Sequence, residues 1–153
     1  MKTPKSKTVH GNKNPHERDV PGNKNPRTRV VRDLSKEQPK WRFSLLDIEG
    51  PWSPLNAKSK DVVLAVLSRL KDFETMTWQA IRASKSHYVT DIDKLSKAAR
   101  DRLNKLNLDD MDGLYSLRFS GTQRLWGFLR DGVFDILWWD PIHEVYPSSK
   151  KHT

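Results

Sequence analysis

The chain has 153 residues, a formal net charge of +9 at neutral pH and no cysteine. The lack of cysteine excludes disulfides, thiolate zinc ligands and cysteine nucleophiles, and it fits a cytoplasmic protein. No apolar run reaches the about 18 residues that a membrane-spanning helix needs, whereas the positive charge favours a polyanionic partner, either nucleic acid or an acidic protein segment.

Residues 1–40 differ in composition from the rest of the chain. They contain eleven Lys or Arg and four Asp or Glu, and every Trp and Phe lies beyond residue 40. We expect this segment to be disordered when free, because it has too little apolar surface to offset an ordering entropy of roughly 1–2 kcal/mol per residue. The pentapeptide GNKNP occurs in it twice, at residues 11–15 and 22–26. Either the segment is a solvated low-complexity arm, or it lies on an acidic protein surface or on RNA phosphates through cations such as Lys13, Lys24, Arg27 and Arg29.

The remaining residues, 41–153, suffice for one compact domain. The stretch KWRFSLLDI at 40–48 alternates at first and predicts a strand, and the Gly and Pro of EGPWSPLN predict a loop. Ser59 is a candidate cap for a helix that runs to Phe73, with apolar residues at three- and four-residue steps. We expect a short helical turn around Trp78 and a second helix over residues 93–106.

Three strands are predicted next, in the segments GLYSLRF, QRLWGFLR and VFDILWW. Asp131-Gly132 is typical of a type I′ hairpin turn between the last two. The acidic stretch LDDMDG at 108–113 lacks the length and ligand spacing of a calcium loop, so we expect no metal there. The order β-α-α-β-β-β predicts an α+β fold of two layers, in which an antiparallel meander packs on two helices.

The segment LYSLRFSGTQRLWGFLRDGVFDILWWDPIHEVY, residues 114–146, resembles the toxins of the RelE/ParE superfamily, most closely those of the HigB/RelE side. In that family a strand with a basic end is followed by a turn and by a strand that opens with an arginine. An aromatic third strand then leads into a polar C-terminal segment with His or Tyr. The matching positions here are Arg118, Arg124, Ile136 to Trp139, His143 and Tyr146. The likeness covers roughly residues 41–148 and leaves out the basic arm.

The resemblance implies the toxin of a toxin–antitoxin system, a small endoribonuclease that cuts mRNA, often on the ribosome, and that a cognate antitoxin protein holds inactive. The superfamily also contains gyrase inhibitors of the ParE type, so the fold alone does not decide the target. A further alternative is a non-catalytic RNA- or protein-binding module on the same fold. No cofactor or metal is expected, because attack by the 2′-OH needs only proton transfer, charge stabilisation and in-line geometry.

Four residues are candidates for this chemistry. His143 is the best acid or base, because an unperturbed imidazole titrates near pH 6.5. Arg118 and Arg124 lie on neighbouring strands and offer planar forks to phosphate oxygens. Tyr146 is a candidate for orienting the 2′-OH or stacking on a base. The strand LYSLRF lacks the lysines that many RelE-type nucleases carry, so catalysis would depend on the two arginines and the histidine.

Each of these residues also has a purely structural interpretation. In this interpretation His143 is a surface histidine whose side chain holds its loop through Asp140 or Glu144. These two carboxylates would either orient the imidazole or repel a phosphate. The arginines suit ion pairs with carboxylates on the sheet surface, and Tyr146 suits an aromatic lid on the core.

Aromatic and basic side chains of the last two strands are candidate RNA contacts. Trp126 and Trp139 are suited to stacking on bases. Arg130 abuts the hairpin tip, and its alternative interpretation is an ordinary solvent-exposed arginine with no role in binding. Adjacent residues of a strand face opposite sides of the sheet, so Trp138 and Trp139 are expected to diverge. One of them should enter the core while the other faces a binding surface.

Overall fold

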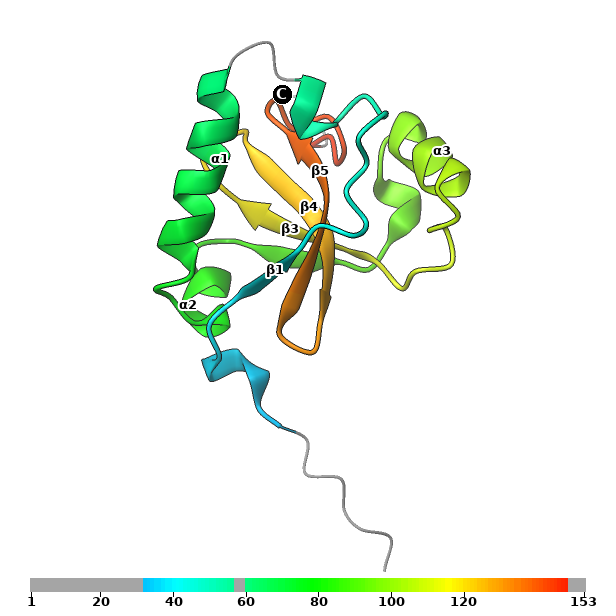
Figure 1. The fold of residues 1–153 in the computed structure, drawn as a ribbon. Coiled ribbons are helices and arrows are strands. Elements are labelled where there is room, and N and C mark those ends of the chain that lie inside the picture. The colour runs from blue at the N-terminus through cyan, green and yellow to red at the C-terminus, as the bar shows by residue number, and fades with distance from the viewer. Residues whose placement is uncertain (1–31, 57–59, 149–153) are drawn as a thin grey trace, which may run out of the picture. The chain divides into compact units, whose positions relative to one another are not determined.

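The computed structural model describes residues 32–56 and 60–148, which belong to a compact unit that begins at Arg32. This part of the chain contains five strands, three α-helices and three short 3₁₀ helices (Figure 1). The strands are β1 (Lys40–Arg42), β2 (His87–Val89), β3 (Leu114–Arg118), β4 (Arg124–Arg130) and β5 (Val133–Asp140). The α-helices are α1 (Lys60–Phe73), α2 (Trp78–Ala83) and α3 (Lys97–Lys105). The 3₁₀ helices are η1 (Leu34–Lys36), η2 (Pro54–Asn56) and η3 (Ile92–Lys94).

The strands form one mixed sheet in the order β1-β5-β4-β3-β2. Its centre is the predicted antiparallel meander of β3, β4 and β5. The predicted hairpin turn is confirmed, because Asp131 and Gly132 have φ angles of 51° and 77°. β1 joins β5 in parallel, and β2 pairs antiparallel with β3 at the other edge. The α+β class is therefore shown, with one parallel pair that the sequence analysis does not predict.

Helices cover both faces of this sheet, which differs from the predicted two layers (Figure 1). The first face carries the α1-side core, whose buried members are Val66, Leu70, Phe73, Trp78, Ile81, Tyr115, Leu117, Leu125, Phe134, Ile136 and Trp139. The second face carries the α3-side core, made of Trp52, Val89, Leu95, Ala99, Leu103, Leu114, Trp126, Phe128, Leu137, Trp138 and Val145. Both faces need to be covered because β5 is buried along nearly its whole length and presents apolar side chains to both sides of the sheet.

The pairing of β4 with β5 is interrupted by a register shift between Trp126 and Gly127. Trp126 lies opposite Trp138 and Gly127 lies opposite Ile136, so Leu137 is an extra residue on β5. Beyond this bulge, Trp138 and Trp139 point to opposite faces, as predicted. Both are buried, however, at 0% and 6% exposure, because each face is covered by its own core.

Several predicted boundaries differ from the structure. The strand expected over residues 40–48 is only β1, and β2 is not predicted at all. The helix expected over 93–106 is divided into η3 and α3. In α1 the buried stripe is Val66, Leu70 and Phe73, while Leu67 is 50% exposed. The proposed cap Ser59 lies outside the described residues.

A buried ion pair fastens the segment between β1 and α1 to α3 and β5. Asp47 accepts hydrogen bonds from Arg102 Nε and Nη2 at 2.7 and 2.6 Å, and from Trp138 Nε1 at 3.0 Å. The main-chain N–H of Gly50 also donates to this carboxylate, at 2.9 Å. Asp47 thus connects three separate parts of the α3-side layer.

The first described residues belong to the folded unit, although the sequence analysis assigns residues up to 40 to the basic arm. Pro39 is buried, and Glu37 O accepts a hydrogen bond from the main-chain N–H of Trp78 at 3.0 Å. The GNKNP repeats and the four arm cations, Lys13, Lys24, Arg27 and Arg29, lie outside the described residues.

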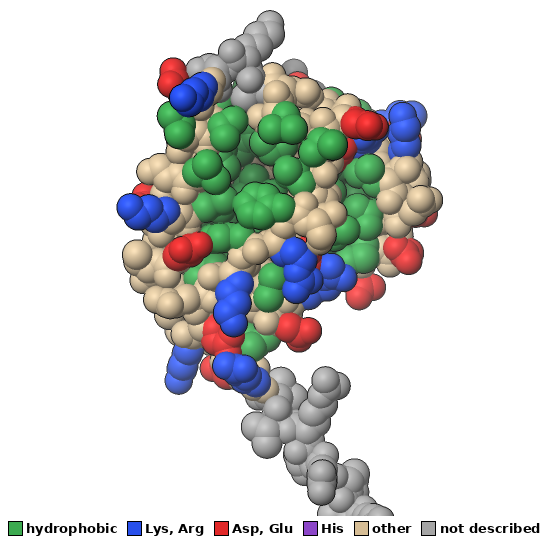
Figure 2. All heavy atoms as spheres, viewed as in Figure 1, with side chains coloured by type: hydrophobic (Ala, Val, Ile, Leu, Met, Phe, Trp, Pro, Cys, Tyr) green, Lys and Arg blue, Asp and Glu red, His purple; other side chains and the backbone are tan. Residues whose placement is uncertain are grey.

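Apolar side chains gather on the surface over α1 and the segment between β1 and α1 (Figure 2). The large hydrophobic residues exposed in these two segments are Phe43, Ile48, Leu55, Leu64 and Leu67. A concentration of exposed apolar side chains is typical of a protein interaction surface.

Candidate functional site

Arg118, Arg124 and Asp140 occupy directly opposed positions on β3, β4 and β5. Arg118 pairs with Arg124, and Arg124 pairs with Asp140. Directly opposed residues of a sheet point to the same face, and Trp126 places this face on the α3 side. The structure thus brings together the two arginines that the sequence analysis selects.

The turn between β3 and β4 holds both guanidinium groups. Ser120 O accepts hydrogen bonds from Arg124 Nη1 at 2.7 Å and from Arg118 Nε at 3.2 Å. Arg124 Nη1 also donates to Gln123 O at 2.9 Å. Because both guanidinium groups donate to the same main-chain oxygen, they are held close to each other. Their remaining N–H groups can donate hydrogen bonds to another acceptor, such as a ligand oxygen.

Arg124 is only 8% exposed, and nearby groups act on its charge in opposite directions. Burial lowers the pKa of its guanidinium, the charge of Arg118 lowers this pKa further, and the charge of Asp140 opposes both effects. Arginine nevertheless stays protonated at neutral pH. The pair is therefore a partly desolvated double positive charge.

Asp140 forms no ion pair with either arginine, although its charge partly offsets that of Arg124, and its hydrogen bonds come from other donors. Its Oδ2 accepts hydrogen bonds from Trp126 Nε1 at 3.3 Å and from the Val145 main-chain N–H at 2.9 Å. Its Oδ1 accepts the Glu144 main-chain N–H at 2.9 Å. Among the described residues, no carboxylate comes within the 4.0 Å of an ion pair with Arg118 or Arg124. The expected alternative of surface ion pairs for these two arginines is therefore not what the structure contains.

His143 lies in the loop that follows β5, and this loop is attached to the β3–β4 turn. Thr122 Oγ1 donates a hydrogen bond to Pro141 O at 3.0 Å, which links the turn that holds the arginines to the His143 loop. His143 itself is half-buried and has a left-handed φ of 61°. Within the described part of the chain its imidazole forms no hydrogen bond or ion pair, so it has no polar contact with either arginine there.

The other predicted site residues have mainly structural positions. Tyr146 packs against the α3-side core, which matches the lid interpretation. Trp126 and Trp139 are 1% and 6% exposed, so neither presents an open ring face to a base, contrary to the expectation. Arg130 is exposed, as the surface interpretation expects, but its guanidinium also forms an ion pair with the buried Asp135 at 2.7 Å.

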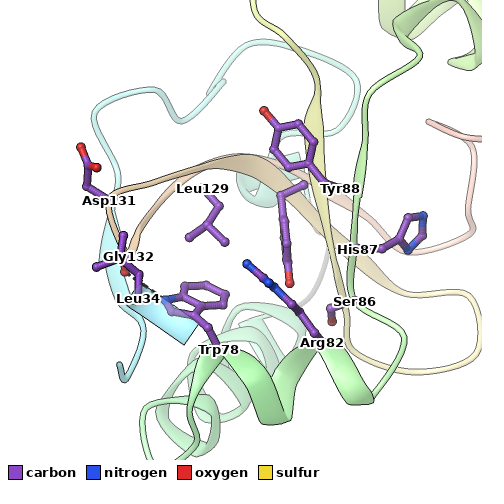
Figure 3. Close-up of a pocket in the computed structure, with 10 residues that line it drawn as sticks. Leu34, Trp78, Arg82, Ser86, His87, Tyr88, Leu129, Asp131 and Gly132 are labelled. Carbon is purple, nitrogen blue, oxygen red and sulfur yellow. Dashed lines mark hydrogen bonds between the residues drawn. The ribbon is translucent and has the colours of Figure 1, made fainter. Parts of the chain in front are cut away.

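A cavity of about 530 Å³ lies on the opposite, α1-side face, between α2, β2 and the β4–β5 hairpin (Figure 3). Its lining includes Trp78, Arg82, Tyr88 and Tyr115. The sequence analysis does not identify this site, because the three-residue strand that supplies Tyr88 is too short to show alternation.

Two classes of feature are not found in the described residues. No three His, Asp or Glu side chains there gather in a way that suits a metal ion. None of the helices between residues 32 and 148 has the length and apolar character needed to cross a membrane.

Comparison with protein-family models, with curated proteins and with solved structures finds no match to this chain. Function must therefore be argued from the residues and their geometry.

Proposed function

We propose that this chain is an endoribonuclease of the RelE/ParE toxin type, in which Arg118 and Arg124 hold the scissile phosphodiester. The observation that carries the proposal is the arginine pair at the end of the meander, which has no ion-pair partner among the described residues and is attached through its turn to the loop of His143. In this proposal mRNA is the substrate, with or without the ribosome, and the reaction needs no metal.

The arginine pair suits the charge that develops during RNA cleavage. When the 2′-oxygen attacks phosphorus, the phosphorane gains negative charge on its non-bridging oxygens, and planar guanidinium forks match this arrangement. Burial of Arg124 strengthens the interaction, since charges attract more strongly where water is excluded. Loss of one such donor typically reduces turnover about 10²- to 10³-fold.

His143 supplies the proton transfer in this proposal. Its imidazole accepts the 2′-OH proton or donates one to the departing 5′-oxygen, which typically contributes about 10²- to 10⁴-fold. Its free ring nitrogens and the left-handed backbone of an exposed loop are compatible with a movement toward the arginines when RNA is bound. The cleaved strand should carry a 2′,3′-cyclic phosphate and a 5′-OH.

A cognate antitoxin is part of the same proposal. An acidic segment of that protein would neutralise the arginine pair, and an apolar segment would cover the exposed residues over α1 shown in Figure 2. In this proposal the antitoxin can contact the apolar surface over α1 whether or not RNA is bound.

Expression in a growing host tests the proposal in cells. The parent chain should arrest growth, and mapping of transcript ends after induction should show new cuts in mRNA. His143→Ala and Arg124→Ala chains that accumulate to the same level should not arrest growth. Arrest by both variants at the parental level would show that the site is wrongly assigned, and cleaved DNA with gyrase in place of mRNA cuts would identify a gyrase inhibitor.

The second candidate function is a non-catalytic RNA-binding module at the same arginine pair. It is favoured by one observation, namely that among the described residues the His143 imidazole has no hydrogen bond to either arginine, while Asp140 and Glu144 lie close to it in the sequence. Such a protein would bind RNA with strong salt dependence and leave mRNA intact, both with ribosomes and without them.

A further inference from the structure

Three aromatic rings, those of Trp78, Tyr88 and Tyr115, line part of the cavity on the α1-side face (Figure 3). Tyr88 and Tyr115 are opposed on β2 and β3, with ring centroids 6.3 Å apart. Trp78 meets Tyr115 edge-on at 5.8 Å and is fixed by a hydrogen bond from its Nε1 to Gly132 O at 3.1 Å. Tyr88 is 41% exposed, so part of its ring is open to a ligand. The walls are thus held in place by the protein while one ring remains accessible.

A single cation is directed into this aromatic space. Figure 3 shows Arg82 reaching from α2 toward the centre of the cavity, whereas His87 and Asp131 point away from it. Within the described residues the Arg82 guanidinium has no carboxylate at ion-pair distance. Its charge is therefore available to an anionic group of a ligand.

The inner end of the cavity also contains a polar group that lacks a good partner. The Tyr115 hydroxyl is buried and has no well-formed hydrogen bond, although the Arg82 guanidinium lies beside it. Burial raises the pKa of Tyr115, and the charge of Arg82 only partly opposes this. Tyr115 therefore stays a neutral hydroxyl, which can donate to a ligand oxygen once Arg82 turns toward an anion.

We propose that this cavity binds one nucleotide unit, with the base against the accessible ring of Tyr88 and the phosphate on Arg82. The volume of about 530 Å³ lies within the range of about 300–1,000 Å³ that is usual for small-molecule sites. Base stacking on aromatic side chains and a guanidinium on phosphate are the usual means by which proteins hold such a unit. The nucleotide is either a free monophosphate or one residue of an RNA strand. The site lies on the other face of the sheet from Arg118 and Arg124, so it does not depend on the proposed nuclease activity.

Calorimetric titration of the full chain with adenosine 5′-monophosphate, adenosine and a short oligoadenylate tests this proposal. Arg82→Ala should weaken monophosphate binding about tenfold or more, and should leave the binding of adenosine unchanged. Arg82→Lys, which keeps the charge but loses the fork, should give an intermediate affinity. Tyr88→Ala should weaken both ligands, because it removes the stacking surface. Lys71→Ala, at an exposed cation of α1, is the matched control and should behave as the parent.

The two sources of the nucleotide give different results. Equal affinity per site for monophosphate and oligoadenylate identifies a free nucleotide, whereas Arg82-dependent binding of oligoadenylate alone identifies an RNA strand. The proposal is overturned if neither probe binds at millimolar concentration, or if Arg82→Ala leaves the affinity for both unchanged in a variant with the parental circular dichroism spectrum. Arg118→Ala and Arg124→Ala should retain monophosphate binding, so loss of RNA cleavage in those chains is distinguishable from failure of this site.

Discussion

Arg124 and Asp140 lie directly opposite each other on β4 and β5, yet they form no ion pair, and the carboxylate accepts hydrogen bonds from Trp126 and from the main chain of Glu144 and Val145. Asp140 thus holds the loop after β5, and its charge only partly offsets the positive charge of Arg124. This arrangement supports the proposal that the arginine pair binds a phosphate.

The first prediction concerns the salt dependence of RNA binding. Each phosphate contact on a single strand contributes about 0.7 to the slope of log affinity against log salt. Arg118→Ala and Arg124→Ala should each lower the slope by about this amount, measured by fluorescence anisotropy with labelled RNA. Arg130→Ala, at an arginine already paired with Asp135, is the control and should leave the slope nearly unchanged. Equal slopes in all four chains would show that the pair does not contact phosphates.

The second prediction concerns Asp140. Asp140→Asn keeps the size of the side chain but turns an amide NH₂ toward a main-chain N–H donor. Because the side chain is fully buried, we expect a loss of about 1–3 kcal/mol in the free energy of unfolding, measured by urea denaturation. Asp109→Asn, at an exposed carboxylate, should change the stability by no more than about 0.5 kcal/mol. An Asp140→Asn chain as stable as the parent would mean that these hydrogen bonds do not hold the loop.

The third prediction uses two glycines of the sheet region. A Cβ at Gly127 would lie 2.1 Å from Asp135 O at the β4–β5 bulge, so the main chain must shift to accept it. Gly127→Ala should therefore lower the free energy of unfolding by about 3 kcal/mol. Gly121→Ala is a matched control, since a Cβ there meets nothing within 4 Å. Similar melting temperatures for the two variants would contradict the register of this strand pair.

The fourth prediction concerns pH. Burial acts to raise the pKa of Asp47, but hydrogen bonds from Arg102 and Trp138 and the charge of Arg102 outweigh it, so the pKa lies below its ordinary value. A carboxyl with a lowered pKa in the folded state stabilises the fold above about pH 3.9, and this stabilisation is lost as the pH falls through the folded pKa.

Urea unfolding of the parent should thus show stability that decreases steeply below about pH 4. Asp47→Asn should be less stable than the parent near neutral pH, and its stability should depend less on pH in the acidic range. If the free energy of unfolding depends on pH in the same way in the parent and in Asp47→Asn, the ion pair with Arg102 does not contribute to the loss of stability in acid.

Much of the meander is predictable from local chemistry. Alternating residues and Asp131-Gly132 locate the last two strands, and the short turn before Arg124 brings that residue beside Arg118. The arginine pair is therefore found from sequence. The hydrogen bonds of Asp140 cannot be predicted from the sequence, because two of its partners are main-chain N–H groups of a loop. The path of this loop depends on the packing of Val145 against the α3-side core.

The errors share a physical origin. Trp126 and Trp139 are assigned to a binding surface because one open face of the sheet is assumed, whereas the α3-side core covers Trp126 and the α1-side core covers Trp139. The apolar run from Ile136 to Trp139 indicates a strand buried on both sides, and this signal favours the observed arrangement. β2 is three residues long, which is too short to show the alternation that predicts a strand, and it is identified by its pairing with β3.

The most direct test of the central claim is the cleavage rate of an end-labelled RNA by purified chains. The parent should produce fragments with 2′,3′-cyclic phosphate ends, Arg124→Ala should be slower by about 10²- to 10³-fold, and His143→Ala by about 10²- to 10⁴-fold. Lys71→Ala should cut at the parental rate, and RNA with 2′-deoxy residues at the cut sites should stay intact. Intact RNA after incubation with the parent, both with ribosomes and without them, or equal rates for the parent and both site variants, would contradict the account.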